Sequence, residues 1–361
     1  MADSNQAPIS ADRGASLRAQ ALWFTARRRA ELQDEPVLPP KRSQLLVRAV
    51  VSLISAGTEL LVYRGEVSAE DDLRLETCAG TFGFPVKYAY QVIGEVVEAG
   101  PDSGFRPGEL VFCRHPHQSL FTLEASTSLV TRVPSDLTPE RAVFVNLLEV
   151  ALNATLDVPV RFGDVVVVFG QGVVGSFCAQ LARRTAGTLI VVDPIEARRS
   201  RALTLGADAA VPPDEARRAV EDLSLGRGAD VGIEVSGAPA ALQAAVEMTG
   251  QEGTIVAVSY FGSRLVPLLL SPEFHFRRQR IVSSQVSSLG SGLQPRWTVE
   301  RRNRVAFDLL RSDWLDTPVS HRFAFERAPE AYRILDEDAD RAMGIMLTYG
   351  VPPSGGKAGA P

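Results

Sequence analysis

Three glycines in the middle of the chain have the spacing of a phosphate-binding turn. Gly170, Gly172 and Gly175 follow the apolar run DVVVVFG, and a helical pattern begins directly after them. Gly170 would permit a tight turn, Gly172 would let a pyrophosphate approach the backbone, and Gly175 would let the helix pack on the strand. Free N–H groups at the start of that helix would face the phosphates. The motif predicts a dinucleotide site, and the residues between its glycines are Gln171, Val173 and Val174.

Asp193 extends this pattern. It ends the next apolar run, TLIVVD, eighteen positions after Gly175. An acid at that place accepts hydrogen bonds from the ribose hydroxyls and repels a 2′-phosphate, which favours NAD(H) over NADP(H). Arg198 and Arg199 follow five and six positions after the acid and would soften that preference. The alternative is a unit of the same architecture whose binding site has degenerated.

The elements that must hold these residues alternate between strand and helix. β-branched runs such as DVVVVFG are typical of strands buried on both faces, and helical patterns separate them between about residues 160 and 287. This alternation predicts an α/β fold with a doubly wound parallel sheet of the Rossmann type. Ser236 and Ser259 follow later strands of the sheet. We expect them either to contact the nicotinamide half of the cofactor or to be ordinary turn residues.

The flanking sequence has a different pattern. Residues 17–135 contain short apolar runs separated by Pro and Gly, which predicts a β-rich region. A helix is expected over 139–157, with Thr138 as its N-cap and Pro139 at its first position. The segment 288–350 is expected to hold one helix, near 298–312, and a strand near HRFAF. The polar and small residues of 1–16 and 351–361 predict disorder.

Composition excludes several classes of protein. The net charge is -5 and the basic runs are short, so a nucleic acid partner is not expected. Apolar runs fall short of the roughly 20 residues that span a bilayer, and the first residues lack the apolar core of a secretory signal. Three scattered cysteines form neither a disulfide framework nor a metal knuckle. A cytoplasmic protein is the simplest interpretation.

Several stretches together resemble the medium-chain dehydrogenase/reductase family. They are ISAGTEL, YRGE, YQVIGEVVEAG, RPGELV, ALNA, the glycine motif and LGAD, and they span about residues 18–349. The resemblance implies a GroES-like catalytic domain at 1–155 and 288–361, interrupted by a Rossmann domain at 156–287, with the active site in the cleft between them. HPHQ and the SSQV…PRW…RR stretch look most similar to the branch of bacteriochlorophyllide dehydrogenase-like proteins.

Zinc-dependent members of this family carry ligands that the chain lacks. By the resemblance, the positions of three catalytic ligands fall on Ala56, Tyr90 and, near the start of the long helix, Asn146, with Glu149 three residues further on. Alanine cannot bind zinc, and tyrosine and asparagine are poor ligands for it. The family's four-cysteine structural zinc lobe is also missing. The sequence therefore predicts no zinc, although Cys113-x-His115-x-His117 remains a weaker metal alternative if that strand bends.

Without a metal, hydrogen-bond donors must stabilise charge on a substrate oxygen. Tyr90, His115 and Tyr63 are the candidate donors. By the resemblance His115 lies at a strand end that lines the substrate pocket, and a histidine pKa near neutrality suits proton donation; the alternative is an ordinary loop histidine. Thr58 and Glu59 match a Thr/Asp pair of relatives and are expected to form a polar relay to bulk water.

These features leave three hypotheses open. The first is a zinc-independent NAD(P)H-dependent reductase of an activated C=C, in an enone or enoyl thioester, because a conjugated substrate delocalises the charge itself. The second is an NAD-dependent dehydrogenase of a secondary alcohol or ketone, and the third is a dinucleotide-binding redox sensor without turnover. A basic groove at Arg277, Arg278 and Arg280 would favour a CoA ester. The last strand, IVSSQV, is expected to form the edge through which a homodimer assembles.

Overall fold

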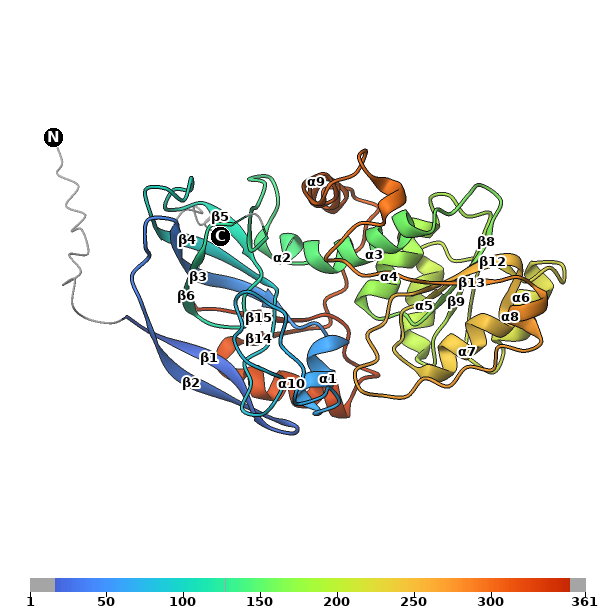
Figure 1. Ribbon diagram of the computed structural model, residues 1–361, viewed down its shortest axis with the longest axis horizontal. Coiled ribbons are helices and arrows are strands. Elements are labelled where there is room, and N and C mark those ends of the chain that lie inside the picture. Colours follow the sequence, from blue (N-terminus) through green and yellow to red (C-terminus); the bar gives the residue numbers. More distant parts are fainter. Residues whose placement is uncertain (1–16, 127, 351–361) are drawn as a thin grey trace, which may run out of the picture.

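The structure is a computed structural model that describes residues 17–126 and 128–350. Two large sheets lie at opposite ends of the molecule, and helices α2, α3 and α9 lie between and above them (Figure 1). The predicted disorder of residues 1–16 and 351–361 concerns segments outside the described residues. Within the described residues no helix is both long and apolar enough to cross a membrane.

The sheet of the dinucleotide unit is six-stranded, parallel and ordered β10-β9-β8-β11-β12-β13. The chain starts in the centre at β8, moves outward to β10, and then returns to fill the other half. Its strands are β8 (Val165–Phe169), β9 (Thr188–Val192), β10 (Ala209–Val211), β11 (Ala229–Glu234), β12 (Thr249–Ala257) and β13 (Arg280–Ser283). Its helices are α4 (Val173–Ala182), α5 (Glu196–Thr204), α6 (Ala216–Leu223), α7 (Pro239–Met248) and α8 (Glu273–Phe276).

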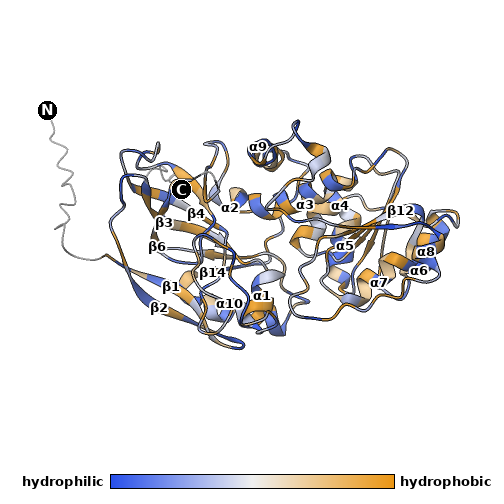
Figure 2. Ribbon diagram, in the orientation of Figure 1, coloured by the Kyte–Doolittle hydropathy of each residue, from blue (hydrophilic) through white to orange (hydrophobic). Residues whose placement is uncertain are grey.

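Strand β8 is buried on both faces, as its continuous apolar run predicts. Val166 and Val168 pack in the cluster formed with α3 and α4, whereas Val165 and Val167 pack in the cluster formed with α6 and α7. The orange strands of this sheet in Figure 2 lie between helices that cover both of its faces. The doubly wound α/β architecture is therefore confirmed.

The second sheet is seven-stranded, with order β14-β15-β3-β4-β5-β7, and β6 also pairs with β3. Strands from the end of the chain therefore complete a sheet that begins near residue 44. Its strands and the adjoining hairpin are β1 (Leu17–Ala26), β2 (Arg29–Val37), β3 (Gln44–Leu53), β4 (Val92–Ala99), β5 (Leu110–Cys113), β6 (Leu120–Glu124), β7 (Val130–Arg132), β14 (His321–Ala324) and β15 (Ile345–Thr348). The helices around it are α1 (Thr58–Tyr63), α2 (Pro139–Ala142), α3 (Val145–Asp157), α9 (Val299–Leu310) and α10 (Ala328–Glu337).

Two helix predictions need correction. The helix expected over 139–157 is two helices, because the backbone between α2 and α3 forms a tighter turn in which Phe144 N donates to Arg141 O at 3.3 Å. Thr138 occupies the N-cap position of α2 but its side chain makes no capping hydrogen bond. The segment 288–350 holds α10 in addition to α9. Its buried residues Ala328, Ala331, Tyr332 and Leu335 have the i, i+3, i+4, i+7 spacing of an amphipathic helix, which the prediction of a single helix overlooked.

Candidate active site

The three glycines of the turn meet three different surroundings. A Cβ on Gly170 (φ +99°) would lie 2.7 Å from Ser236 Cα, and a Cβ on Gly175 would lie 2.0 Å from Gly170 O. A Cβ on Gly172 would meet nothing within 4 Å. The first and third glycines are thus required by close backbone packing, while the second opens onto free space at the start of α4. This is the arrangement that a bound pyrophosphate needs.

Asp193 is held against this turn. It is 2% exposed, its Oδ2 accepts from Gln171 N at 2.7 Å and its Oδ1 accepts from Ile195 N at 2.8 Å. The Gln171 side chain in turn donates to the carbonyls of Gly170 and Gly175. Each carboxylate oxygen keeps a second lone pair, so the acid remains able to accept from ribose hydroxyls.

Arg198 lies beside this acid and also reaches the other half of the molecule. Its Nη1 is 3.9 Å from Asp193 Oδ2, and its Nη2 donates to Ala339 O and Ala342 O at 2.8 and 3.0 Å. Arg199 donates to the carbonyls of Asp193 and Pro194. Both guanidinium groups are therefore occupied by backbone carbonyls, and only Arg198 is directed at the acid.

The predicted nicotinamide-side serines form one turn around a residue that the sequence analysis missed. Glu234, the last residue of β11, is fully buried, and its Oε1 accepts from Ser236 N, Ser236 Oγ and Gly237 N at 2.8 to 2.9 Å. Gly237 N also donates to Ser259 Oγ at 2.8 Å. The serines therefore shape the turn. Glu234, the acid two residues before Ser236-Gly237 in the sequence, was the signal that could have shown which residue holds the turn together.

The second group of polar residues surrounds Tyr90. The Tyr90 hydroxyl donates to Ser55 Oγ at 2.7 Å. Burial, followed by the nearby Glu59 carboxyl, raises the Tyr90 pKa to about 12, while hydrogen bonds with Ser55 and Thr58 oppose that rise. Tyr90 is therefore a phenol at neutral pH, placed beside two hydroxyls.

Glu59 joins this group to the C-terminal part of the chain. It is fully buried, its Oε1 accepts from Ser55 N at 3.1 Å, and its Oε2 lies 3.2 Å from His117 Nε2 and accepts from the Tyr332 hydroxyl. The sequence marked His117 only as a possible metal ligand, and it did not mark Tyr332, which reaches the site from α10. All three side chains are buried, so these contacts alone do not carry the predicted relay out to bulk water.

His115 and Tyr63 lie outside this hydrogen-bonded group. The His115 ring stacks on Phe121 at 3.8 Å, and its Nδ1 lies 2.9 Å from Pro116 O. Burial lowers the His115 pKa to about 3, so the ring is neutral at physiological pH and a poor proton donor. The Tyr63 hydroxyl donates to Arg28 O at 2.8 Å. This geometry favours structural roles for both residues.

The residues at the zinc-ligand positions do not fit zinc. Ala56 is exposed and has no side-chain atom that could bind a metal, Asn146 is buried on α3, and Tyr90 is a protonated phenol at neutral pH, which is a poor zinc ligand. Glu149, near the third ligand position, is paired with Arg114 at 3.1 Å. In the described part of the chain no group of three or more His, Cys, Asp or Glu side chains is placed to hold a metal, and this includes the Cys113-x-His115-x-His117 stretch. No step of the reaction is therefore assigned to zinc.

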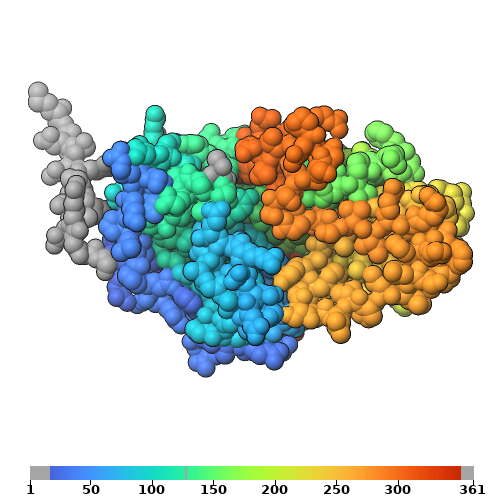
Figure 3. All heavy atoms as spheres, in the orientation of Figure 1, coloured from blue at the N-terminus to red at the C-terminus, as the bar shows by residue number. Residues whose placement is uncertain are grey.

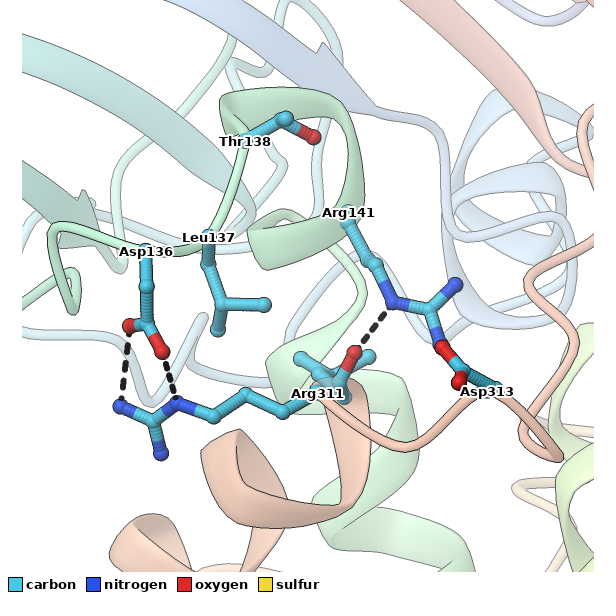
Figure 4. A pocket seen from close by; sticks show the side chains of 7 residues that line it. Asp136, Leu137, Thr138, Arg141, Arg311 and Asp313 are labelled. Carbon is cyan, nitrogen blue, oxygen red and sulfur yellow. Dashed lines mark hydrogen bonds and ion pairs between the residues drawn. The ribbon is translucent and has the colours of Figure 1, made fainter.

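A pocket between α2 and the end of α9 lies away from these residues (Figure 4). Arg141 turns its guanidinium to backbone carbonyls there, with Nη2 donating to Ser312 O and Leu315 O at 2.8 and 2.7 Å. Arg311 pairs with Asp136 at 2.7 Å. The charges of the pocket are thus used to fasten α9 to α2.

Comparison with known proteins finds dehydrogenases among the relatives of this chain. A zinc-binding dehydrogenase family model matches residues 173–299. D-guloside 3-dehydrogenase of Escherichia coli is 29% identical over 72% of this chain and 76% of its own length. The 2-desacetyl-2-hydroxyethyl bacteriochlorophyllide A dehydrogenase of Cereibacter sphaeroides is 28% identical over 90% and 96%.

Solved structures agree in fold. An Escherichia coli oxidoreductase/dehydrogenase of unknown specificity superposes with a TM-score of 0.78 at 14% identity, covering 93% of this chain and all of its own. A Sinorhizobium meliloti zinc-binding dehydrogenase bound to NADP gives 0.73 at 19%, over 92% and 99%. With the relatives named above, the turn at Gly170 and the two-sheet architecture support an NAD(P)-dependent oxidoreductase of the medium-chain dehydrogenase/reductase family.

Proposed function

We propose that the protein exchanges hydride between NAD(H) and a secondary alcohol or ketone of a hydroxyl-rich metabolite, without zinc. The observation that carries this proposal is the Tyr90 hydroxyl, which stands at a zinc-ligand position and is bonded to Ser55 beside Thr58 and the buried Glu59. Relatives named for a guloside, sorbitol and butanediol support an alcohol in preference to an enone. An activated alkene remains the competing substrate class.

The proposed mechanism uses the phenol as the group that binds substrate oxygen. When bound, the nicotinamide ring supplies or accepts the hydride. In ketone reduction, Tyr90 turns its O–H from Ser55 to the substrate oxygen and donates the proton as the alkoxide develops. Ser55 and Thr58 then donate hydrogen bonds to the phenolic oxygen of Tyr90. These bonds stabilise the negative charge left on that oxygen, which the nearby Glu59 disfavours.

NAD(H) is proposed over NADP(H) because both Asp193 oxygens are fixed at the end of β9 by backbone N–H groups. A 2′-phosphate would meet this carboxylate at short range. Arg198 is the one nearby cation directed at the acid, and backbone carbonyls already occupy its Nη2.

A CoA ester is not part of the proposal. Arg280 is the first residue of β13, and Arg278, just before it, pairs with Glu252 in the first half of β12. Both arginines therefore lie toward the amino ends of these two strands. Cofactor and substrate bind outside the carboxyl ends of such sheets. Arg277 also faces inward, since it donates to the carbonyls of Glu247 and Thr249.

We propose a homodimer that forms through the edge strand β13. This strand pairs only with β12 among the described strands, so one of its edges is open. The segment before it exposes large apolar side chains, namely Leu265, Leu269, Leu270 and Phe276. Exposed apolar side chains in the segment that leads into an open edge strand suit contact with a second copy. Unpaired cysteines suit a cytoplasmic location, which we also propose.

A substrate panel with matched variants tests the proposed activity. NADH oxidation is followed with ketones and keto-sugars, with enones and enoyl-CoAs, and without substrate. Tyr90→Phe should lower the rate of ketone reduction by about 100-fold, within the range that general acid catalysis contributes. Tyr63→Phe, which loses a hydroxyl outside the group, is the control and should retain activity. Turnover of enones alone would replace the alcohol proposal, and NADH binding without turnover of any substrate would favour the redox sensor.

A further inference from the structure

We propose that Arg302, on α9, is a positioning residue that fixes the carboxyl end of β13 against α3, and so sets how the nicotinamide half of the cofactor sits. Arg302 belongs to the SSQV…PRW…RR stretch, to which no function has yet been assigned. The inference rests on the proposed use of NAD(H), but it concerns a contact that exists before any substrate binds.

The Arg302 guanidinium is the centre of a buried cluster. Its side chain is 1% exposed, with Nη1 donating to Asn153 Oδ1 and Nη2 donating to Val286 O, both at 2.6 Å. Its Nε lies 3.5 Å from Glu149 Oε1. One side chain therefore connects helix α3 with the backbone three residues beyond β13.

The same cluster continues into both halves of the molecule. Ser284, directly after β13, donates to Asp157 Oδ2 at 2.8 Å, and Asn153 Nδ2 donates to the same oxygen at 2.8 Å. On the other side, Arg114 Nη2 donates to Glu149 Oε2 at 3.1 Å and its Nη1 donates to Ser128 O. The Arg302 cluster thus joins the strand end of the dinucleotide unit, through α3, to Arg114 at the end of β5 in the seven-stranded sheet.

The position of β13 gives this cluster a consequence for the cofactor. Asp193 assigns the adenosine half to the β8–β10 side, so the nicotinamide half lies over the carboxyl ends of β11, β12 and β13. Residues 284–286 directly follow the carboxyl end of β13. A shift of this backbone would move the nicotinamide relative to Tyr90, and small displacements of reacting groups lower hydride transfer strongly.

Lysine cannot replace the guanidinium in this cluster. A single ammonium group does not reach Asn153, Glu149 and the Val286 carbonyl in one plane, as the fork of an arginine does. Arg302→Met preserves much of the side-chain volume but removes the positive charge, so that Arg114 is the remaining cation paired with Glu149. Arg301 supplies a matched control, because it is exposed and its guanidinium lies 4.3 Å from the centre of the Trp297 ring.

The test compares Arg302→Lys and Arg302→Met with Arg301→Met in the full-length protein. Amide hydrogen exchange of Ser284 is measured without cofactor, and NADH is then titrated by its own fluorescence. For both Arg302 variants we expect exchange of the Ser284 amide, which donates to Ala257 O at 3.0 Å, to rise about tenfold or more, and bound NADH to fluoresce less. Their Kd for NADH should stay within about threefold, because the adenosine and phosphate contacts remain. Arg301→Met should match the parent protein in every measurement.

Turnover provides a second readout. With an accepted substrate, Arg302→Lys should lower kcat by about 10- to 100-fold with little change in KM, and NADH deuterated at the transferred position should show a larger isotope effect. A folded Arg302→Lys protein with parental exchange of the Ser284 amide and parental NADH fluorescence would overturn the inference. If Arg302→Met does not fold, Arg302→Lys and Asn153→Ala decide the matter. If no substrate is turned over, the proposed function fails while exchange and fluorescence still decide the role of Arg302.

Discussion

The preference for NAD(H) can be tested at one carboxylate. Asp193→Asn keeps the size of the side chain and removes its charge, leaving one oxygen to accept from the N–H groups of Gln171 and Ile195. At about 4 Å, a carboxylate and one phosphate charge repel by about 1 kcal/mol in water and about 4 kcal/mol at an effective dielectric constant of 20. Since 1.4 kcal/mol is tenfold in affinity, removing this repulsion should raise the NADPH/NADH affinity ratio by between about 5-fold and about 700-fold.

The assay is a fluorescence titration of each reduced cofactor against each protein. Asp193→Asn should weaken NADH, because a ribose acceptor is lost, and strengthen or retain NADPH. Glu196→Gln is the matched control, since Glu196 is an exposed acid at the start of α5 only three residues further on, and it should leave the ratio unchanged. An unchanged ratio in a folded Asp193→Asn protein would refute the view that this carboxylate selects the cofactor.

Three further predictions follow from the same geometry. Gly175→Ala should abolish measurable NADH binding or prevent folding, because the new Cβ would lie 2.0 Å from Gly170 O; parental binding by calorimetry would contradict this. The rate of ketone reduction should stay constant from neutral into mildly alkaline pH, since Tyr90 stays protonated up to its pKa of about 12. His115→Gln should leave this pH profile unchanged near neutrality, because the His115 pKa lies near 3. A loss of rate near pH 7 that disappears in His115→Gln would oppose the assignment. Dialysis against a chelator should leave turnover unchanged, whereas one zinc per chain by metal analysis, with activity lost on removing it, would show that zinc is used.

Local signals in the sequence were enough to predict the dinucleotide half of the fold. Gly170, Gly175 and Asp193 lie within one strand–helix–strand unit, and Gly175 and Asp193 contact neighbours within that unit. Gly170 packs against the more distant Ser236, but its own place in the motif was enough to identify it. The burial of β8 on both faces follows in the same way from its run of valines.

The candidate catalytic group was only half predictable. Tyr90, Thr58 and Glu59 could be picked out by their place in a known motif, but the partners of Glu59 are set by the tertiary fold. His117 arrives from the loop after β5 and Tyr332 from α10, 273 residues beyond Glu59. His115 was the histidine predicted from the sequence as a donor, but it stacks on Phe121, whereas His117 contacts Glu59.

The return of the chain to its first large sheet has a consequence for how the protein is made. Val51 of β3 pairs with Thr348 of β15, so this sheet cannot close until almost the whole chain has left the ribosome. The parallel six-stranded unit, by contrast, is contiguous and can fold as a unit during synthesis. While that unit folds, we expect β3 to keep the edge that later pairs with β15 unpaired. During this time the open edge can aggregate or bind chaperones. Glu59 gains its buried hydroxyl partner only in the last step, so a chain truncated before α10 would bind cofactor on a folded unit and yet lack a finished catalytic half.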